Sequence, residues 1–223
     1  MLVTGGGRGI GAAAARLAAQ RGFAVAVNFL KDEGSARSVV DHIQNSGRKS
    51  VAIRGDVSIE ADVLRVFDTV DRELGRLTAL VNNAGVVDRQ ARVEDITPGR
   101  LQRMFAINVF GPFLCAREAV KRMSTRRGGA GGAIVNVSSG AARLGSPGMY
   151  VDYAASKGAI DTFTVGLAKE VVGEGIRVNA VRSGFALTQI HASGGVPDRV
   201  ERMREHIPMK RGAEPEEIAR AIL

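Results

Sequence analysis

The chain has 223 residues, of which 45% are apolar and 24% are charged, and these proportions are typical of a globular chain rather than a disordered one. The formal net charge is +8, but the basic residues are spread along the chain and form no nucleic-acid-binding motif. The single cysteine, Cys115, excludes an intramolecular disulfide, and no apolar run reaches the roughly 18 residues of a membrane helix. We therefore expect one cytoplasmic domain, residues 1–223, that binds neither nucleic acid nor a membrane.

Short apolar runs alternate with amphipathic stretches along the whole chain. We expect six buried strands, at residues 2–3, 23–29, 50–53, 77–81, 133–137 and 176–181. Between them, helical spacing of apolar residues is clearest at residues 10–21, 33–45, 97–123 and 153–172. Strands that alternate with helices form βαβ units, so the pattern predicts a Rossmann-type α/β fold, a doubly wound parallel sheet covered on both faces.

A glycine-rich segment, Thr4-Gly5-Gly6-Gly7-Arg8-Gly9-Ile10-Gly11, follows the first predicted strand and opens the first predicted helix. Glycines let the backbone turn tightly and approach a pyrophosphate, whose negative charge is stabilised at a helix N-terminus. Such a segment alone also fits an ordinary turn between a strand and a helix. Its position here predicts a dinucleotide-binding site.

Tyr153 and Lys157 lie four residues apart in a predicted helix and therefore share one face. A tyrosine with a pKa of about 10 is a poor base at neutral pH, but a nearby ammonium stabilises the phenolate and lowers that pKa. Such a tyrosine exchanges a proton with a substrate oxygen while a nicotinamide exchanges a hydride. This spacing alone also fits ordinary packing, and it gains weight from the glycine-rich segment upstream.

These two motifs, together with Asn82-Asn83-Ala84-Gly85 after the fourth predicted strand, resemble the short-chain dehydrogenase/reductase family along nearly the whole chain. Within that family the chain is most similar to bacterial 3-oxoacyl-carrier-protein reductases and glucose 1-dehydrogenase-like proteins. The resemblance implies an NAD(P)-dependent oxidoreductase acting on a small-molecule carbonyl or secondary alcohol, assembled as a homotetramer or homodimer. A non-catalytic regulator that binds NADP(H) on the same scaffold remains the alternative.

The resemblance also implies the catalytic residues. Tyr153 is the expected general acid/base, and Lys157 is expected to lower its pKa and to hold the nicotinamide ribose. Ser139, which aligns with the family pattern better than Ser138, is expected to hydrogen-bond the substrate oxygen, although its interval to Tyr153 is one residue longer than usual. Asn108 is expected to anchor a water that relays protons to the lysine.

The expected cofactor-binding residues follow the same motifs. The backbone beside Asn83 lines the ribose while Asn82 mainly holds the sheet together, Asp56 and Val57 contact the adenine, and Thr188 contacts the nicotinamide amide. The complete expected set is Gly5, Arg8, Gly9, Ile10, Gly11, Asn28, Asp56, Val57, Asn83, Ala84, Gly85, Tyr153, Lys157, Gly184 and Thr188.

Charges near the end of the second predicted strand favour NADP(H) over NAD(H). An acid at that position would accept hydrogen bonds from the ribose 2′-hydroxyl and repel a 2′-phosphate. The position is assigned to Asn28, which is neutral, and Arg8 reaches the same corner. Asp32 and Glu33 keep NAD(H) open if the loop folds them back.

The chain departs from the family in three places. The family usually has Pro-Gly where this chain has Ser183-Gly184, which should loosen the start of the expected substrate lid, residues 185–209. Ala186 stands where a larger aliphatic residue is common. The sequence ends at Leu223 inside a predicted helix, whereas the resembling proteins continue into a final strand, so we expect the sheet to lack that strand. No spacing of Cys, His and carboxylates predicts a metal site, and the substrate is not specified.

Overall fold

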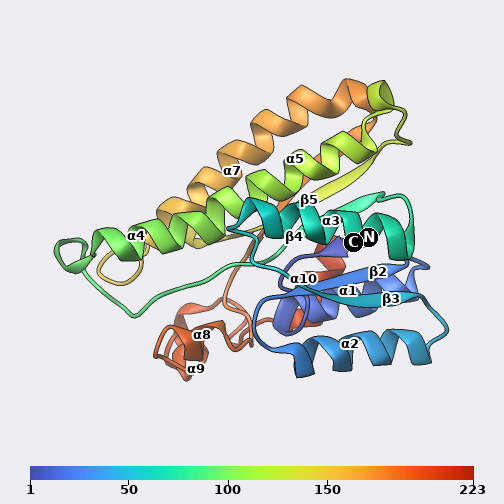
Figure 1. Cartoon of the computed structure of the whole chain (residues 1–223). Helices are drawn as coiled ribbons and strands as arrows, with labels where there is room; N and C mark the ends of the chain where they lie inside the picture. The colour runs from blue at the N-terminus through green and yellow to red at the C-terminus, as the bar shows by residue number, and fades with distance from the viewer.

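A computed structural model describes all 223 residues and contains one sheet of six parallel strands with helices on both faces (Figure 1). The strands are β1 (Leu2–Val3), β2 (Val25–Phe29), β3 (Ser50–Arg54), β4 (Ala79–Asn82), β5 (Gly132–Ser139) and β6 (Ile176–Ser183). Their order across the sheet is β3-β2-β1-β4-β5-β6. The predicted doubly wound fold is confirmed, and strand ends differ from the predicted ones by two residues at most.

Successive residues of the strands face opposite layers of helices. Leu2, Ala26 and Leu80 pack on one side, whereas Val3 and Val81 pack on the other. One layer contains α1 (Gly9–Gln20), α2 (Glu33–Asn45) and α10 (Pro215–Ile222), and the other contains α3 (Glu60–Leu74), α5 (Gly111–Met123) and α7 (Val151–Val171). Burial on both faces explains why the strands are continuous apolar runs rather than alternating ones.

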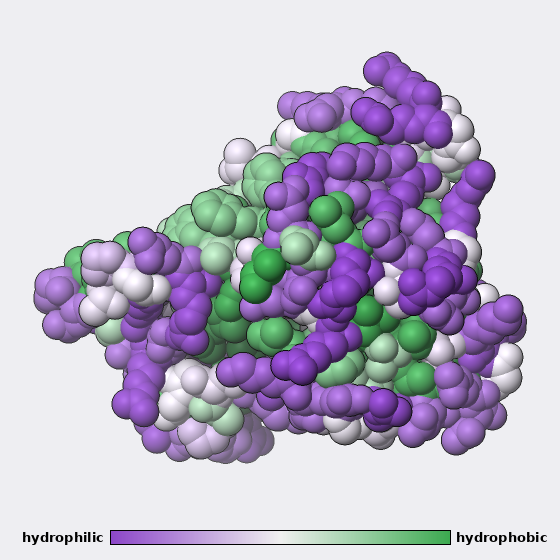
Figure 2. Space-filling view, viewed as in Figure 1, coloured by the Kyte–Doolittle hydropathy of each residue, from purple (hydrophilic) through white to green (hydrophobic).

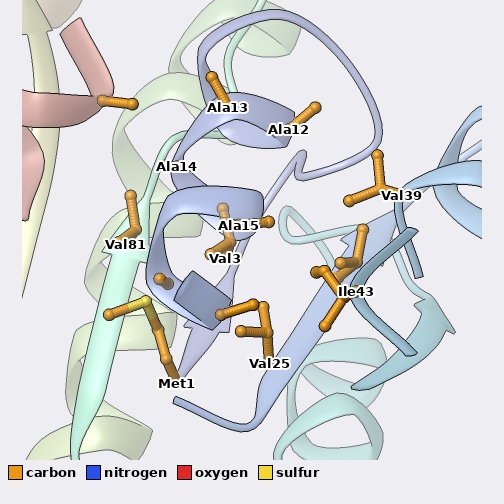
Figure 3. Close-up of a cluster of buried hydrophobic side chains, with 14 of the residues drawn as sticks. Met1, Val3, Ala12, Ala13, Ala14, Ala15, Val25, Val39, Ile43 and Val81 are labelled. Atoms are coloured by element: carbon orange, nitrogen blue, oxygen red, sulfur yellow. The ribbon is translucent and has the colours of Figure 1, made fainter. Parts of the chain in front are cut away.

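Small side chains bring α1 close to the sheet. Residues 12–15 are four consecutive alanines, each at most 4% exposed, and they pack with Val3, Val25 and Val81 of the strands and with Val39 of α2 (Figure 3). Alanine has the highest helix propensity and adds little bulk. The start of α1, which follows the glycine-rich loop, is thereby fixed against the end of β1.

The helical region expected at residues 97–123 is interrupted by a wider turn. It comprises α4 (Pro98–Phe105), a π-helical segment (Ala106–Phe110) and α5. The side chain of Thr97 caps α4 by accepting a hydrogen bond from the N–H of Arg100 at 3.3 Å. A π-helical turn changes which face a residue presents, and here Asn108 lies within that turn and is fully buried.

The expected lid, residues 185–209, contains two short helices, α8 (Ile190–Ser193) and α9 (Arg199–Arg202). They lie together at one side of the molecule, below α4 in the view of Figure 1. β6 forms one edge of the sheet, and α10 is the last element and packs on α1. None of the helices is both long and apolar enough to span a bilayer.

Candidate active site

A cavity of about 1180 Å³ opens at the carboxyl ends of the strands. In a doubly wound sheet the ligand crevice lies where the strand order reverses, which in this chain is between β1 and β4. Of the expected site residues, only Gly11 and Asn108 do not line the cavity. The structure therefore brings together motifs that are distributed from residue 5 to residue 188 of the chain.

The glycine-rich loop between β1 and α1 has the geometry of a phosphate cradle. Gly5 and Gly9 have φ values of +60° and +53°, which side chains disfavour. A Cβ on Gly11 would lie 2.4 Å from the Gly5 carbonyl oxygen and 2.5 Å from Nδ2 of Asn83. No side chain caps the N-terminus of α1 and no acid occupies its first turn, so its backbone N–H groups are free to bind an anion. These features fit a dinucleotide pyrophosphate.

Thr4 and Asn83 hold this loop against the segment that follows β4. The hydroxyl of Thr4 accepts hydrogen bonds from the N–H groups of Asn83 and Ala84, both at 3.0 Å. The amide of Asn83 donates to the carbonyl oxygens of Thr4 and Gly5 at 2.9 and 3.0 Å. The neighbouring Asn82 is buried in the sheet, where it donates to Oδ1 of Asn136 at 2.9 Å. This is the sheet-holding role expected for Asn82.

Asn28, which is expected in the cofactor site, makes its hydrogen bonds within the protein. Its amide donates to the carbonyl oxygens of Ile53 and Gly55 at 3.3 and 3.0 Å and accepts from the N–H of Gly5 at 3.4 Å. Its polar atoms therefore join the glycine-rich loop to the end of β3, and the side chain is buried. Asn28 borders the cavity, but its amide is already engaged within the protein.

The acids that could favour NAD(H) are engaged with α2. Asp32 caps this helix by accepting hydrogen bonds from the hydroxyl and the N–H of Ser35 at 2.7 and 2.9 Å. These hydrogen bonds hold the pKa of Asp32 below its ordinary value, and Arg8 contributes in the same direction. Glu33 pairs with Arg37 at 2.7 Å. The cations Arg8 and Lys31 line the cavity at this corner.

Burial shifts the pKa values of Tyr153 and Lys157 toward their neutral forms. Lys157 donates to the Val137 carbonyl oxygen at 2.8 Å, and burial lowers its pKa to about 8, although Asp161 opposes the shift. Burial raises the pKa of Tyr153, with Ser139 opposing. The shift of Tyr153 is opposite in direction to the lowering expected from Lys157, whose Nζ lies 5.8 Å from the centre of the tyrosine ring.

The two serines at the end of β5 have distinct surroundings. Ser138 is buried, and its hydroxyl donates to the Lys157 carbonyl oxygen at 3.4 Å. Ser139 is only partly buried, accepts a hydrogen bond from the N–H of Ala141 at 3.1 Å and lies beside the Tyr153 hydroxyl. The additional residue between Ser139 and Tyr153 therefore does not separate them.

Asn108 lies behind the cavity and supports its wall. Its amide accepts from the N–H of Val86 at 2.8 Å and donates to the carbonyl oxygen of Val86 at 2.9 Å and to the Ser156 hydroxyl at 3.2 Å. A Cβ on Gly85 would lie 3.4 Å from Oδ1 of Asn108 and 3.6 Å from Nζ of Lys157. Asn108 is therefore close to the lysine, and it fixes the loop that follows the Asn82–Gly85 motif.

Arg199 is a cavity residue that sequence reasoning does not identify. Its guanidinium lies over the rings of Tyr150 and Phe185, 4.4 and 5.4 Å from their centres, and it borders the cavity on the side of Tyr153. Tyr150 is buried and also borders the cavity, so it both packs and lines the pocket. No local spacing indicates this cluster, because its three members come from distant parts of the chain.

Comparisons with known proteins agree with this geometry. The family model described as short chain dehydrogenase matches residues 1–195. The chain is 55% identical to the uncharacterized oxidoreductase YgfF of Escherichia coli K12 over all of this chain and 90% of that protein. It is 33% identical to the chloroplastic NADPH-dependent aldehyde reductase 1 of Arabidopsis thaliana, over 98% of this chain and 76% of that protein.

Solved structures share the whole fold. A short-chain dehydrogenase from Burkholderia cenocepacia in complex with NADP superposes with a TM-score of 0.90 at 30% identity, covering 99% of this chain and 87% of that one. The 3-ketoacyl-(acyl-carrier-protein) reductase of Brucella melitensis complexed with NADH gives 0.89 at 29% identity, with the same coverage. With its glycine cradle and its Ser-Tyr-Lys cavity, the chain belongs to the short-chain dehydrogenase/reductase family of NAD(P)-dependent oxidoreductases.

Proposed function

We propose that this protein reduces a carbonyl compound with NADPH, and oxidises the corresponding secondary alcohol in reverse, with Tyr153 as general acid/base. The observation that carries the proposal is the convergence of Ser139, Tyr153 and Lys157 in the cavity that also contains the glycine cradle. The dinucleotide supplies a hydride to the carbonyl carbon when it is bound there.

The residues of the chain account for the proton and the orientation. As the carbonyl carbon gains the hydride, its oxygen takes the proton of the Tyr153 hydroxyl, so that an aldehyde or ketone becomes an alcohol. Ser139 donates a hydrogen bond to the same oxygen and keeps it beside the phenol. Lys157, buried behind the tyrosine, stabilises the phenolate that forms and holds the ribose.

Replacing Tyr153 with phenylalanine tests the catalytic role. The variant keeps the ring that packs in the cavity but has no proton to transfer, so turnover should fall at least about 100-fold while NADPH affinity stays within about twofold. Steady-state rates and a fluorescence titration with NADPH measure the two effects. A biological activity that persists in this variant would instead support the NADP(H)-binding regulator.

NADPH is the preferred cofactor in this proposal because of the charges at the corner beside α2. The solved relatives hold either NADP or NADH, so the preference rests on this chain's own residues. Arg8 and Lys31 line the corner, whereas Asp32 is turned to the cap of α2. Two cations beside an engaged acid favour a 2′-phosphate over a free hydroxyl.

The Arg8→Ala variant tests this preference. It should weaken NADPH binding by roughly 10-fold or more, as expected for the loss of a charge-assisted hydrogen bond, and change NADH binding by less than about twofold. Arg21→Ala at the exposed opposite end of α1 is the matched control. Equal losses of affinity for NADPH and NADH would contradict the assignment of Arg8 to the 2′-phosphate.

Further parts of the proposal concern the lid and the assembly. Residues 185–209 border the cavity beside Tyr153 and cover the substrate.

A second copy of the chain packs on α5 and α7 to give a homodimer or homotetramer. Three exposed side chains support this interface: Phe110 of the π-helical segment, Phe113 of α5 and Val165 of α7, which are 59%, 47% and 55% exposed. Phe113 stacks on Phe163 of α7, and Figure 2 shows apolar surface along α5. Patches of this kind mark sites of association.

A further inference from the structure

Arg199 differs from the neighbouring arginines because its side chain has no acidic partner. Arg202, in the same short helix, pairs with Asp198 at 2.8 Å, and Arg204 pairs with Glu201 at 3.5 Å. The guanidinium of Arg199 contacts only the rings of Tyr150 and Phe185 among its charged or aromatic neighbours. Arg199 is therefore a partly buried cation whose charge the protein does not neutralise.

The acids that line the cavity are engaged elsewhere. Asp32 caps α2 through Ser35. Asp56 accepts hydrogen bonds from the N–H and the hydroxyl of Ser58 at 2.9 and 2.6 Å. Asp88 pairs with Arg103. Each carboxylate is thus held by its own local partner, and none of them pairs with the Arg199 guanidinium.

The surroundings of Arg199 also fix its direction. Stacking on two rings restrains the plane of the guanidinium and leaves the N–H groups of its edge free to donate. Nε2 of the nearby His191 donates a hydrogen bond to the Ala186 carbonyl oxygen at 3.0 Å. Burial lowers the pKa of His191, to which the charge of Arg199 also contributes. At neutral pH the free charge on this wall is therefore that of Arg199.

We propose that Arg199 binds a carboxylate of the substrate, so that the substrate class is oxo acids and the corresponding hydroxy acids. A planar guanidinium with free N–H groups matches the two oxygens of a carboxylate. Arg199 and Tyr153 border the same part of the cavity, so one small molecule reaches both, with its carboxylate on Arg199 and its carbonyl oxygen at Ser139 and Tyr153. This inference rests on the proposed carbonyl reduction.

The test compares 2-, 3- and 4-oxo acids with their methyl esters as substrates at pH 7 with saturating NADPH. Wild-type protein should give a kcat/KM at least about tenfold higher for the best acid than for its ester. Arg199→Gln should lower kcat/KM for that acid roughly 10- to 100-fold and for the ester less than about threefold. Arg202→Gln, one turn along the same helix and exposed, is the control and should change neither.

Three outcomes would overturn the inference while leaving carbonyl reduction intact. In the first, Arg199→Gln lowers kcat/KM for the acid and for its ester by the same factor. In the second, the wild type has a higher kcat/KM for the ester than for the acid. In the third, it prefers carbonyl compounds that carry a phosphate ester over those that carry a carboxylate. A calorimetric titration of the same oxo acids into NADP-saturated Tyr153→Phe protein, with and without Arg199→Gln, measures recognition without turnover. If the oxo acids bind in an Arg199-dependent way but the wild type does not turn them over, the inference about Arg199 stands and the proposed reaction is refuted. If the oxo acids neither bind nor react, the inference and the proposed reaction are both refuted.

Discussion

Tyr153 and Lys157 share one face of α7, and burial favours the neutral form of both. The raised pKa of Tyr153 means that its hydroxyl carries a proton throughout the neutral range. The lysine, with a pKa of about 8, titrates close to that range. A protonated phenol is the form that donates to a carbonyl oxygen, as the proposed reduction requires.

The depressed pKa of Lys157 makes folding depend on pH. The folded state gives up the lysine proton near pH 8, whereas an unfolded chain holds it up to about 10.5. The unfolded state therefore binds more protons between these values, so this group's contribution to stability rises with pH across that window. Below pH 8 the charged, buried ammonium costs about 3 kcal/mol.

Lys157→Met should consequently remove this dependence. Relative to the variant, the wild type should gain about 3 kcal/mol of unfolding free energy between pH 7.5 and 10.5. Loss of the Val137 hydrogen bond adds an offset that does not vary with pH. Urea unfolding at several pH values measures the difference, and Lys169→Met on the exposed side of α7 is the control. A constant difference across the window would show that the ammonium is not buried as described.

For individual residues, local spacing in the sequence identifies the site residues well but predicts their surroundings poorly. Tyr153 and Lys157 meet because four residues along a helix return to one face, which a sequence specifies directly. The direction of the Tyr153 pKa shift depends on burial of its side chain. The hydrogen bonds of Asn28 depend on the end of β3 beside it. Arg199 escapes detection for the same reason, since its aromatic partners belong to other segments.

Among elements, one ion pair connects α4 to the start of α7, next to Tyr153. Arg100 donates to both oxygens of Asp152 at 2.7 and 3.0 Å, and its remaining nitrogen donates to the Arg89 carbonyl oxygen at 2.7 Å. The Asp152 side chain is fully buried. This bidentate contact fixes the turn that carries the proposed catalytic tyrosine.

Replacing one member of the ion pair should lower the free energy of unfolding more than removing both charges. Arg100→Met leaves a buried carboxylate without a partner and should cost about 3–5 kcal/mol of unfolding free energy. The double variant Arg100→Met/Asp152→Asn should recover much of that loss, because the amide carries no charge. Urea denaturation of the wild type, both single variants and the double variant gives the coupling energy. Strictly additive losses would contradict a direct interaction.

The existence and order of the elements are more predictable than their internal irregularities. All six strands could be predicted because burial on both faces leaves continuous apolar runs. The π-helical turn at Ala106–Phe110 could not, since apolar residues continue at helical spacing across it. The short helices α8 and α9 have four residues each, too few for a periodicity of apolar residues to indicate them.

For the whole molecule, the exposed Phe113 on α5 provides the main test of assembly. Phe113→Glu places a charge at the centre of the proposed contact and should shift the protein toward a monomer. Light scattering coupled to gel filtration gives the mass, and circular dichroism verifies that the fold is kept. Leu64→Glu on α3 is the control for an added surface charge. An unchanged mass would place the interface elsewhere.

The hydrogen bonds between Thr4 and Asn83 join positions 79 residues apart in the chain. The glycine cradle is therefore complete only after β4 has docked against β1, a contact that forms slowly because a long loop must close first. A partly folded chain lacks this binding site, so the dinucleotide binds only the folded protein and stabilises the folded state by mass action. Binding of the dinucleotide should therefore slow unfolding and leave the rate of folding almost unchanged.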